Sequence, residues 1–404
     1  MFRHVSFCRA VRRRRLGCAA IVAAATLITA CQSGGPPALS LEEAKQVTAE
    51  FAKPAFVPPQ RTIGDIRQLI GEPKTADQDC AEVQAWRNKS VELDVERTGN
   101  SPRGVAATAA PLAVVVDGQL DRGNYKNTAE LLTTAISRHS SKRSDPLKRG
   151  VFRSQLARLR AAIGDYPGAE RALSTASSEW FKTRNPRRDV YRTYYTSWGE
   201  GEIAQSRGFL PTAETHYRRA REAGRRVIGR ARLLASQLAR NLLLQGRLVE
   251  AEVEARQAIR SAWISGDPYS STTAKTLTLL AEIRREQGNI EDTEYLTRRA
   301  VSMHEYDCAP ADSLSFAFSR QVLAGALAAK GDWPGALEQF ELVEQGLAGE
   351  PESLQRLFGG NIDWALALLN TGRAQDAVKR LEGALSLARE RSGEDSYKVA
   401  EIQA

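Results

Sequence analysis

Few residues of this chain are of the types that perform catalysis or hold metals. Among its 404 residues there are 5 Cys and 4 His, and those after residue 31 are Cys80, Cys308, His139, His216 and His304. His304 and Cys308 stand four residues apart, so they could share one helix face as a metal half-site or a Cys/His dyad. No second pair completes a metal site, and the chain has no phosphate-cradling glycine loop, HExxH motif or nucleophile elbow. The sequence therefore predicts no enzyme, no catalytic residue, no bound metal and no cofactor.

The elements that would position these residues come from an internal repeat, which accounts for the chain after residue 100. In each repeat a glycine ends a predicted helix A, and the chain then turns into a predicted helix B. Successive glycines are 38 to 44 residues apart. They are Gly123, Gly164, Gly208, Gly246, Gly288, Gly331 and Gly372. Seven recurrences in register predict an all-α solenoid of stacked helix pairs.

Small residues recur at three fixed distances from the turn glycines, with Val or Thr in a few repeats. They stand seven places before, five places after and twelve places after each glycine. In the fourth repeat these residues are Ala239, Ala251 and Ala258. A larger side chain would hold the helix axes apart, so the pattern predicts that paired helices come closest at these positions.

This pattern resembles the tetratricopeptide repeat. The phrases GDYPGAERAL at 164–173 and GDWPGALEQF at 331–340 match the turn and second helix of that repeat. The mean interval near 42 residues is similar to the kinesin-light-chain type. The resemblance covers about three quarters of the chain, and it implies an α-solenoid of about seven helix pairs that forms a right-handed superhelix.

The resemblance also indicates which side chains would face a partner. In such a solenoid, helix A lines the concave surface at about thirteen, ten, six and three places before the turn glycine. The predicted partner-binding residues are Arg158, Tyr195, Trp198, Glu202, Arg240, Glu282 and Arg285. Aromatic residues flanked by Arg and Glu are typical of a binding hot spot. The alternative interpretation is that Tyr194, Tyr195 and Trp198 simply pack between helices.

One departure from the family limits this prediction. Repeats of the kinesin-light-chain type often carry paired Asn on helix A, which can grip a peptide backbone. The positions nine before the glycine hold Gln155, Gly199, Gln237, Leu279, Val322 and Asp363 in the last six repeats. The absence of an Asn ladder argues against a uniform clamp on a peptide backbone.

A disulfide between Cys80 and Cys308 is not expected from the repeat pattern. Cys80 lies before the first repeat and Cys308 lies at the end of the fifth. Because repeats contact only their neighbours, the two sulfur atoms should lie tens of ångströms apart, far beyond the roughly 2 Å of an S–S bond.

The first thirty residues are typical of an export signal. Residues 1–15 are basic, and residues 16–30 form an uncharged, mostly apolar run. That run is short for a membrane-spanning helix of about 20 residues and suits a signal peptide. It ends in the letters ITAC, which resemble the lipobox of bacterial lipoproteins. The resemblance implies a lipidated Cys31 and, with Gln32 next, an outer-membrane protein that faces the periplasm.

The chain thus divides into four predicted segments. Residues 1–30 are the lipoprotein signal peptide, and residues 31–61 are the lipidated cysteine and a Pro-rich tether. Residues 62–103 form a short helical or irregular lead-in, and residues 104–404 form the repeat solenoid.

The charge of the chain argues against nucleic acid. The formal net charge is +9, but six arginines lie in residues 1–30 and no acid does, so the remainder carries only +3. A phosphate-binding protein needs a more concentrated positive field. The basic stretch at 217–232 has almost no interleaved aromatic residue to stack bases, so a solvated helix face or contact with anionic lipid is expected there.

Two classes of function are compatible with these features. The first is a membrane-tethered, periplasm-facing scaffold whose concave groove binds a segment of a partner protein, with no nucleic acid and no small-molecule substrate. The second follows from RTIGDI at 61–66, which is similar to the N-terminal region of bacterial tetratricopeptide proteins that end in a CHAT caspase-like peptidase domain. In that case the chain is the regulatory or substrate-binding half of a peptidase whose catalytic domain is absent from it. A pilotin-like envelope-assembly lipoprotein is a third, repeat-built alternative.

Overall fold

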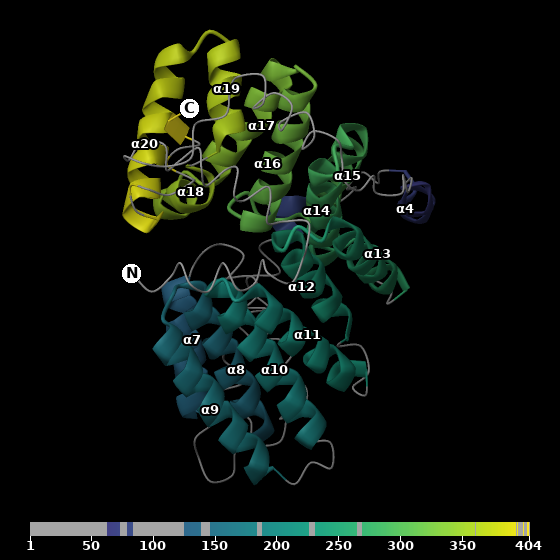
Figure 1. Ribbon diagram of the computed structural model, residues 1–404, viewed down its shortest axis with the longest axis vertical. Coiled ribbons are helices and arrows are strands. Elements are labelled where there is room, and N and C mark those ends of the chain that lie inside the picture. Colours follow the sequence, from purple (N-terminus) through teal and green to yellow (C-terminus); the bar gives the residue numbers. More distant parts are fainter. Residues whose placement is uncertain are drawn as a thin grey trace, which may run out of the picture. The chain divides into compact units, whose positions relative to one another are not determined.

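A computed structural model describes the chain over residues 63–72, 79–83, 125–138, 146–183, 188–225, 231–264, 269–359 and 361–392, and at 394, 399 and 402–403. By its contacts the chain divides after Arg61. All described residues belong to the second unit, Thr62–Ala404. Within them the secondary structure is entirely helical (Figure 1).

Antiparallel helix pairs make up the repeats. The first repeat is described only by its helix B, α7 (Tyr125–Arg138). Five complete pairs follow, and they are α8 (Pro146–Ala162) with α9 (Tyr166–Lys182), α10 (Arg188–Ser206) with α11 (Leu210–Arg225), α12 (Ala231–Leu244) with α13 (Leu248–Ile264), α14 (Ser271–Glu286) with α15 (Ile290–Tyr306), and α16 (Leu314–Ala329) with α17 (Trp333–Gly346). The seventh repeat contains α18 (Pro351–Phe358), α19 (Ile362–Asn370) and α20 (Ala374–Ser392).

The turn glycines have the conformation that the repeat pattern predicts. From Gly164 to Gly372, all six have a φ between +71° and +85°, a region that L side chains rarely adopt. Gly123 lies outside the described residues. Where the structure describes the small residues at the three fixed distances, all of them are buried, and Ala239 and Ala251 are fully so. At Gly201 an added Cβ would come within 2.6 Å of the Tyr217 ring, which explains why this repeat has no side chain there. These predictions are confirmed.

Helix B of two repeats begins with the same cap. In the phrase GDYPGA, the Asp165 side chain accepts a hydrogen bond of 2.9 Å from the backbone N–H of Gly168. In GDWPGA, Asp332 accepts one of 3.1 Å from Gly335. A proline follows each cap within the first turn, where its missing N–H costs nothing.

Helix A of the seventh repeat is broken, which the repeat pattern did not predict. The sequence Gly359-Gly360-Asn361 separates α18 from α19. Two successive glycines disfavour a continuous helix, and the Asn361 side chain accepts a hydrogen bond from the Trp364 N–H and so caps α19.

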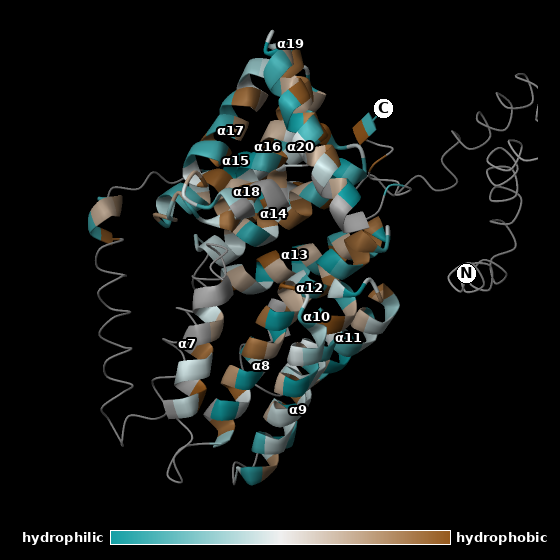
Figure 2. Cartoon of the chain, turned by 90° about the vertical axis from the view of Figure 1, so that its left-hand side faces the viewer, coloured by the Kyte–Doolittle hydropathy of each residue, from teal (hydrophilic) through white to brown (hydrophobic). Residues whose placement is uncertain are grey.

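Apolar and polar residues are both visible along the helices (Figure 2). The apolar side chains form several buried clusters along the array. The cluster of the fourth and fifth repeats also contains Ile63, Ile66 and Ile70, three residues that precede the repeats. The lead-in is therefore part of the folded array.

The lead-in packs along helix B of the fifth repeat. It contains α4 (Gly64–Ile70) and a helical turn at residues 80–83. The Arg67 guanidinium carbon lies 3.9 Å from the centre of the Tyr295 ring in α15. Further along, Arg299 of α15 donates hydrogen bonds to the backbone oxygens of Ile70 and Glu72. The contacts occur in the same order in both segments, so the lead-in runs in the direction of α15.

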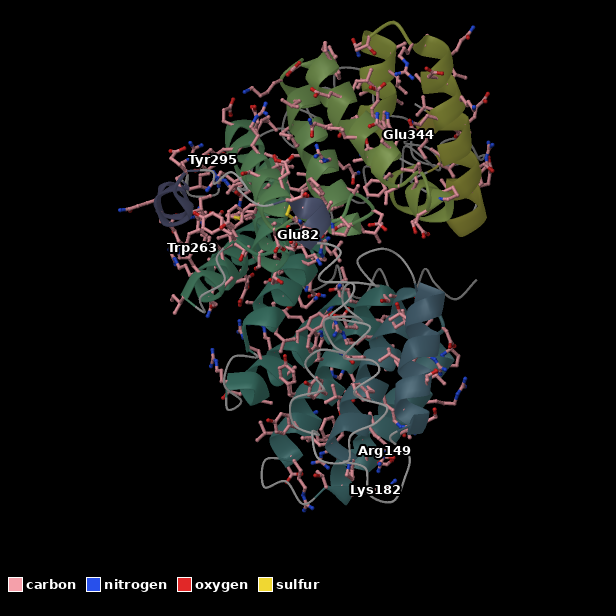
Figure 3. The ribbon with its side chains drawn as sticks, turned by 180° about the vertical axis from the view of Figure 1, so that it is seen from behind. Glu82, Arg149, Lys182, Trp263, Tyr295 and Glu344 are labelled. Atoms are coloured by element: carbon pink, nitrogen blue, oxygen red, sulfur yellow. A yellow bond between two sulfur atoms is a disulfide. The ribbon has the colours of Figure 1, made fainter. Side chains whose placement is uncertain are left out.

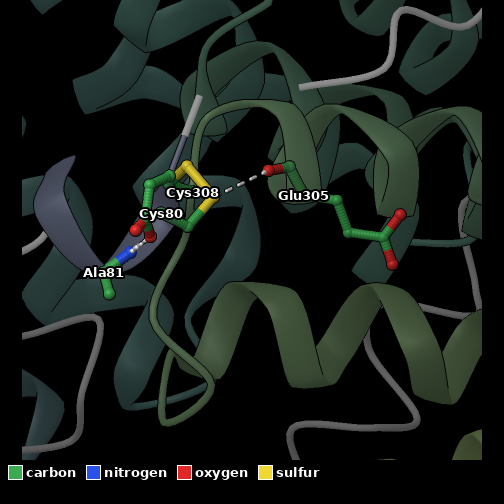
Figure 4. Close-up of a disulfide and its surroundings, with 5 residues drawn as sticks. Cys80, Ala81, Glu305 and Cys308 are labelled. Carbon is green, nitrogen blue, oxygen red and sulfur yellow. Dashed lines mark hydrogen bonds between the residues drawn. A yellow bond between two sulfur atoms is a disulfide. The ribbon is translucent and has the colours of Figure 1, made fainter. Parts of the chain in front are cut away.

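This course brings Cys80 to Cys308, and the two form a disulfide with a Cα–Cα distance of 5.1 Å (Figure 4). The prediction that their sulfur atoms lie tens of ångströms apart is wrong. The rule that a unit contacts only its neighbours concerns the stacking of one repeat on the next, but the lead-in is not a repeat. It reaches the fifth repeat directly along α15, and this course leaves no signal in the spacing of the repeats.

No helix in the described parts of the chain has both the length and the apolar character needed to cross a membrane.

The predicted signal peptide, the lipidation site Cys31 and the Pro-rich tether lie outside the described residues.

Candidate functional site

Charged residues alternate along the helix A row. Six places before the turn glycine stand Arg158 in α8, Glu202 in α10, Arg240 in α12, Glu282 in α14 and Gly325 in α16. Arg158 meets Glu202 of the next repeat, and Arg240 likewise meets Glu282. We call these residues, together with Trp198, Arg285, Phe318 and Asp363, the helix A face.

The first part of the helix A face joins three of the predicted residues. The Arg158 guanidinium carbon lies 3.9 Å from the centre of the Trp198 ring, a cation–π distance. The Trp198 Nε1–H donates a hydrogen bond of 2.9 Å to Glu202 Oε1. Arg158 Nε lies 3.8 Å from the same oxygen. Trp198 is only 7% exposed, so Arg158 and Glu202 provide most of the accessible surface here.

Tyr195 lies in an aromatic core between helices. Its ring stacks on Trp180 with centroids 5.5 Å apart and meets Tyr194 edge to face at 5.0 Å. Gly150 leaves the space that Trp180 fills, since an added Cβ there would lie 2.6 Å from the indole ring. Tyr195 therefore offers a partner little surface, and so does Trp198, whose ring meets Tyr194 edge to face at 5.6 Å. This burial is what the interpretation of interhelical packing predicts for Tyr194, Tyr195 and Trp198.

The second part of the helix A face joins the other predicted residues. Arg240 donates a hydrogen bond of 3.3 Å to Glu282. Its guanidinium carbon also lies 5.6 Å from the centre of the Phe318 ring. Arg285 forms an ion pair with Asp363, with a closest N–O distance of 3.9 Å. Arg240, Arg285 and Asp363 are each 35% to 41% exposed, so this part is open to solvent.

Two of these contacts join helices A that are two repeats apart. Arg240 of α12 reaches Phe318 of α16 past α14, and Arg285 of α14 reaches Asp363 of α19 past α16. Gly325 lies between the second pair, and an added Cβ would lie 3.0 Å from both Arg285 Nη1 and Asp363 Oδ2. Side chains two repeats apart can meet only where the helices A converge on this face. The row of helices A therefore curves inward between α12 and α19.

Burial weakens the negative charge of this part. Burial raises the pKa of Glu282, and the neighbouring Arg240 and Arg285 only partly offset it. Burial likewise raises the pKa of Asp363 against the opposing effect of Arg285. The arginines keep their charge under all ordinary conditions, so positive charge dominates as the pH falls.

The arginines of the helix A face use few of their hydrogen-bond donors. Arg158 Nε is buried and has no hydrogen-bond partner among the described residues. The described contacts of Arg285 to Glu286 and Asp363 are 3.7 and 3.9 Å long, beyond hydrogen-bond reach. A guanidinium carries five donors in a fixed fork that suits carboxylates and carbonyl oxygens. Arg240, whose bond to Glu282 is 3.3 Å long, and Arg285 can therefore accept a further ligand without losing a short internal bond.

The pair His304 and Cys308 does not form a metal half-site here. Cys308 is disulfide-bonded, so it has no thiolate to bind a metal or act as a nucleophile. His304 is fully buried and stacks on Phe316 with ring centroids 5.2 Å apart. Within the described residues, no group of three or more His, Cys, Asp or Glu is arranged to hold a metal ion.

Sequence reasoning missed Phe318, Gly325 and the role of Asp363. Asp363 stands nine places before its glycine, whereas Arg285 stands three places before its own. Their contact follows a diagonal across three repeats, which a comparison of equivalent positions cannot find. A signal for this contact was Gly325, a glycine at a position where five other repeats carry a charged residue.

No family model matches the chain, and no curated protein matches its sequence. Solved structures of similar fold do exist. A Rap protein complexed with Competence and Sporulation Factor is 12% identical with a TM-score of 0.53, over 74% of this chain and 80% of that one. BtubC (BKLC) from P. vanneervenii is 17% identical with a TM-score of 0.43, over 58% of this chain and 92% of that one. The nearly identical TPR-like repeats of a Podosopora anserina putative kinesin light chain are 18% identical with a TM-score of 0.40, over 52% and 99%. The chain thus has an all-α, tetratricopeptide-like repeat fold, as its sequence predicted.

Proposed function

We propose that this protein is an interaction scaffold and that its helix A face binds a segment of a partner protein. Stacked helical repeats present extended surfaces of this kind. The observation that carries the proposal is the inward curvature between α12 and α19, where Arg240 and Arg285 meet residues two repeats away. A curved face lined by accessible arginines and an apolar ring suits an extended segment better than a small molecule.

The chemistry of the face favours a partner segment rich in acceptor groups. Arg240 and Arg285 carry unused donors, and the raised pKa values of Glu282 and Asp363 mean that these acids lose their charge earlier than usual as the pH falls. Carboxylates bind guanidinium groups through short, charge-assisted hydrogen bonds. We therefore expect acidic segments to bind best, with an apolar residue set against Phe318.

Peptide display on the full chain tests this proposal. The best recovered peptides are synthesised, labelled and titrated by fluorescence anisotropy against wild type and the double variant Arg240→Ala/Arg285→Ala. Loss of two charged hydrogen-bonding groups should weaken binding by about tenfold or more. The control is Arg247→Ala, because Arg247 is 37% exposed, much as Arg240 is, but pairs with Glu214 and Glu250 at the turn into α13. Equal affinity for wild type and the double variant would refute the assignment.

We also propose that Cys31 is lipidated and that the repeats face the periplasm. Two observations support this: the signal-like residues before Cys31, and the Cys80–Cys308 disulfide, since disulfides persist in oxidising compartments. Labelling with radioactive palmitate should mark wild type and leave Cys31→Ala unlabelled in the native host. If both proteins were labelled to the same extent, the anchor would have to lie elsewhere.

A further inference from the structure

The surface that receives the lead-in is built like a binding site. It consists of Arg256 and Arg260 of α13 and Asp292, Tyr295 and Arg299 of α15, and we call it the α13–α15 docking face. Tyr295 and the nearby Trp263 lie beside α4 in Figure 3. This face belongs to helices B, whereas the helix A face belongs to helices A.

The apolar contact has the spacing of a recognised short helix. Ile63, Ile66 and Ile70 are at most 1% exposed, and they are three and four residues apart. They pack into the same apolar cluster as Ile259 of α13 and Leu296 of α15. Amphipathic helices that bind grooves on other proteins use anchors with this spacing.

A chain of alternating charges begins and ends on the lead-in helix. Asp65 pairs with Arg256, and Arg256 pairs with Glu252 at 2.6 Å. Glu252 lies 3.5 Å from Arg284, and Arg284 lies 2.7 Å from Asp292. Asp292 completes the chain at 3.5 Å from Arg67. The four middle groups come from α13, α14 and α15, and three of them, Glu252, Arg256 and Arg284, are less than 8% exposed.

Arg299 is a buried charge whose hydrogen-bond acceptors come from the lead-in. It is 3% exposed, and its Nη2 donates to the backbone oxygens of Ile70 and Glu72 at 2.9 and 2.8 Å. Its Nε and Nη1 have no hydrogen-bond partner among the described residues. The carbonyl oxygens at the end of a helix carry partial negative charge, so they match a buried guanidinium. Without the lead-in this charge would lose both of these acceptors.

We propose that the α13–α15 docking face is a binding site for a short amphipathic helix, that residues 63–72 are its resident ligand, and that the Cys80–Cys308 disulfide prevents the ligand from exchanging. Only noncovalent contacts hold residues 63–72 themselves. The disulfide lies beyond them, with Cys80 partly exposed and Cys308 buried. A dithiol reductant would open it by giving up two electrons and two protons, which leaves two cysteine thiols and one oxidised reductant.

The test uses the full chain and a labelled peptide of residues 62–73, TIGDIRQLIGEP. In the receptor chain, Cys80→Ser/Ile66→Asp removes the disulfide and expels the resident helix. Fluorescence anisotropy should show saturable binding to this folded variant and no binding to oxidised wild type. Adding Arg299→Ala to the receptor should weaken binding by about tenfold or more, because two hydrogen bonds to a charged group are lost. The matched control peptide carries the Ile66→Asp change and should not bind.

Absence of peptide binding to the folded variant, or binding that ignores Arg299→Ala, would overturn the proposal. Hydrogen exchange of wild type covers the case in which the variant does not fold. On reduction, the amides of α4 should exchange about tenfold faster or more, while those of α14 keep their protection. Unchanged exchange in α4 after complete reduction would equally overturn it.

Discussion

Arg284 and Arg285 are neighbours on α14, yet they belong to opposite faces of the array. Arg284 is 4% exposed and makes hydrogen bonds of 3.1 and 2.7 Å to Asp292 and one of 2.7 Å to Gln287. Arg285 is 35% exposed, and its described charge contacts are 3.7 and 3.9 Å long. The same residue type thus has its donors satisfied on the helix B side and largely unused on the helix A side.

This difference distinguishes charges that the fold needs from charges that can bind a partner. In the chain of alternating charges that begins and ends on the lead-in helix, acids and bases from α13, α14, α15 and the lead-in pair with one another, so each side chain is needed by the fold. On the helix A face the pairs are long and partly solvated, and such pairs contribute little to stability. The charges of the helix A face can therefore bind a partner with little loss of stability in the repeats.

The largest loss of stability should come from removing one of the charges that the fold needs. Arg284→Ala would leave Glu252 and Asp292 partly uncompensated in a buried site, so we expect the free energy of unfolding to fall by about 3–5 kcal/mol. Arg285→Ala should lower it by less than about 1 kcal/mol, because its pairs are exposed and long. Urea unfolding of the two oxidised variants measures both values. Similar losses in the two variants would contradict the distinction between the faces.

The disulfide should have the next largest effect. Replacing Cys80 and Cys308 together by Ser should lower the free energy of unfolding by about 2–4 kcal/mol, because the unfolded chain gains freedom. A dithiol reductant should bring wild type to the same level and should not affect the double variant. The prediction fails if reduced and oxidised wild type unfold at the same urea concentration.

The backbone conformation at Cys308 allows a finer test of the region around the disulfide. Cys308 has a φ of +49° and is the only non-glycine residue with positive φ among those described. This conformation costs an L residue roughly 1–2 kcal/mol. In chains that also carry Cys80→Ser, Cys308→Gly should therefore be more stable than Cys308→Ser by about 1 kcal/mol. A serine variant as stable as the glycine variant in urea would count against this.

The two faces should also respond to pH in opposite directions. Burial opposes ionisation of Asp65, but Arg256 and Arg260 more than offset it and hold its pKa below the usual 3.8. Its contribution to stability is complete above that usual value and is lost as the pH falls through the lowered pKa. The raised pKa of Glu282 has the reverse effect, with a contribution that is complete below the usual 4.5 and lost as the pH rises through the folded value.

Thermal unfolding across pH measures both contributions. Asp65→Asn should reduce the loss of stability that wild type shows in acid below the usual carboxyl pKa. Glu282→Gln should reduce the loss that wild type shows as the pH rises above it. A shift of both profiles in the same direction would contradict the assigned charges.

The fold of the repeats was predictable to a large extent, for a local reason. The turn at Gly164 and the tight contacts at Ala239 and Ala251 depend on residues within one repeat and its neighbour. Such contacts leave a periodic trace in the sequence. The break between α18 and α19 is also local, and the paired glycines Gly359 and Gly360 were a signal that the periodic pattern concealed.

The candidate site was predictable only in part. Arg158, Glu202, Arg240 and Glu282 were found because they occupy equivalent positions, and the structure pairs them as neighbours. Tyr195 shares that periodicity but is buried, because position along a helix does not distinguish an accessible aromatic ring from one that packs against Trp180.

The sequence by itself determined the helix pairs, their turns and the small residues between them, since each depends on contacts within about two repeats. Tertiary structure alone decided the contact between Arg285 and Asp363, the course of the lead-in and the disulfide. These contacts join residues that are 78 to 229 positions apart. Whether such residues meet depends on the sum of the small rotations between successive repeats. For the lead-in, it depends on where a segment that does not repeat finds a complementary surface.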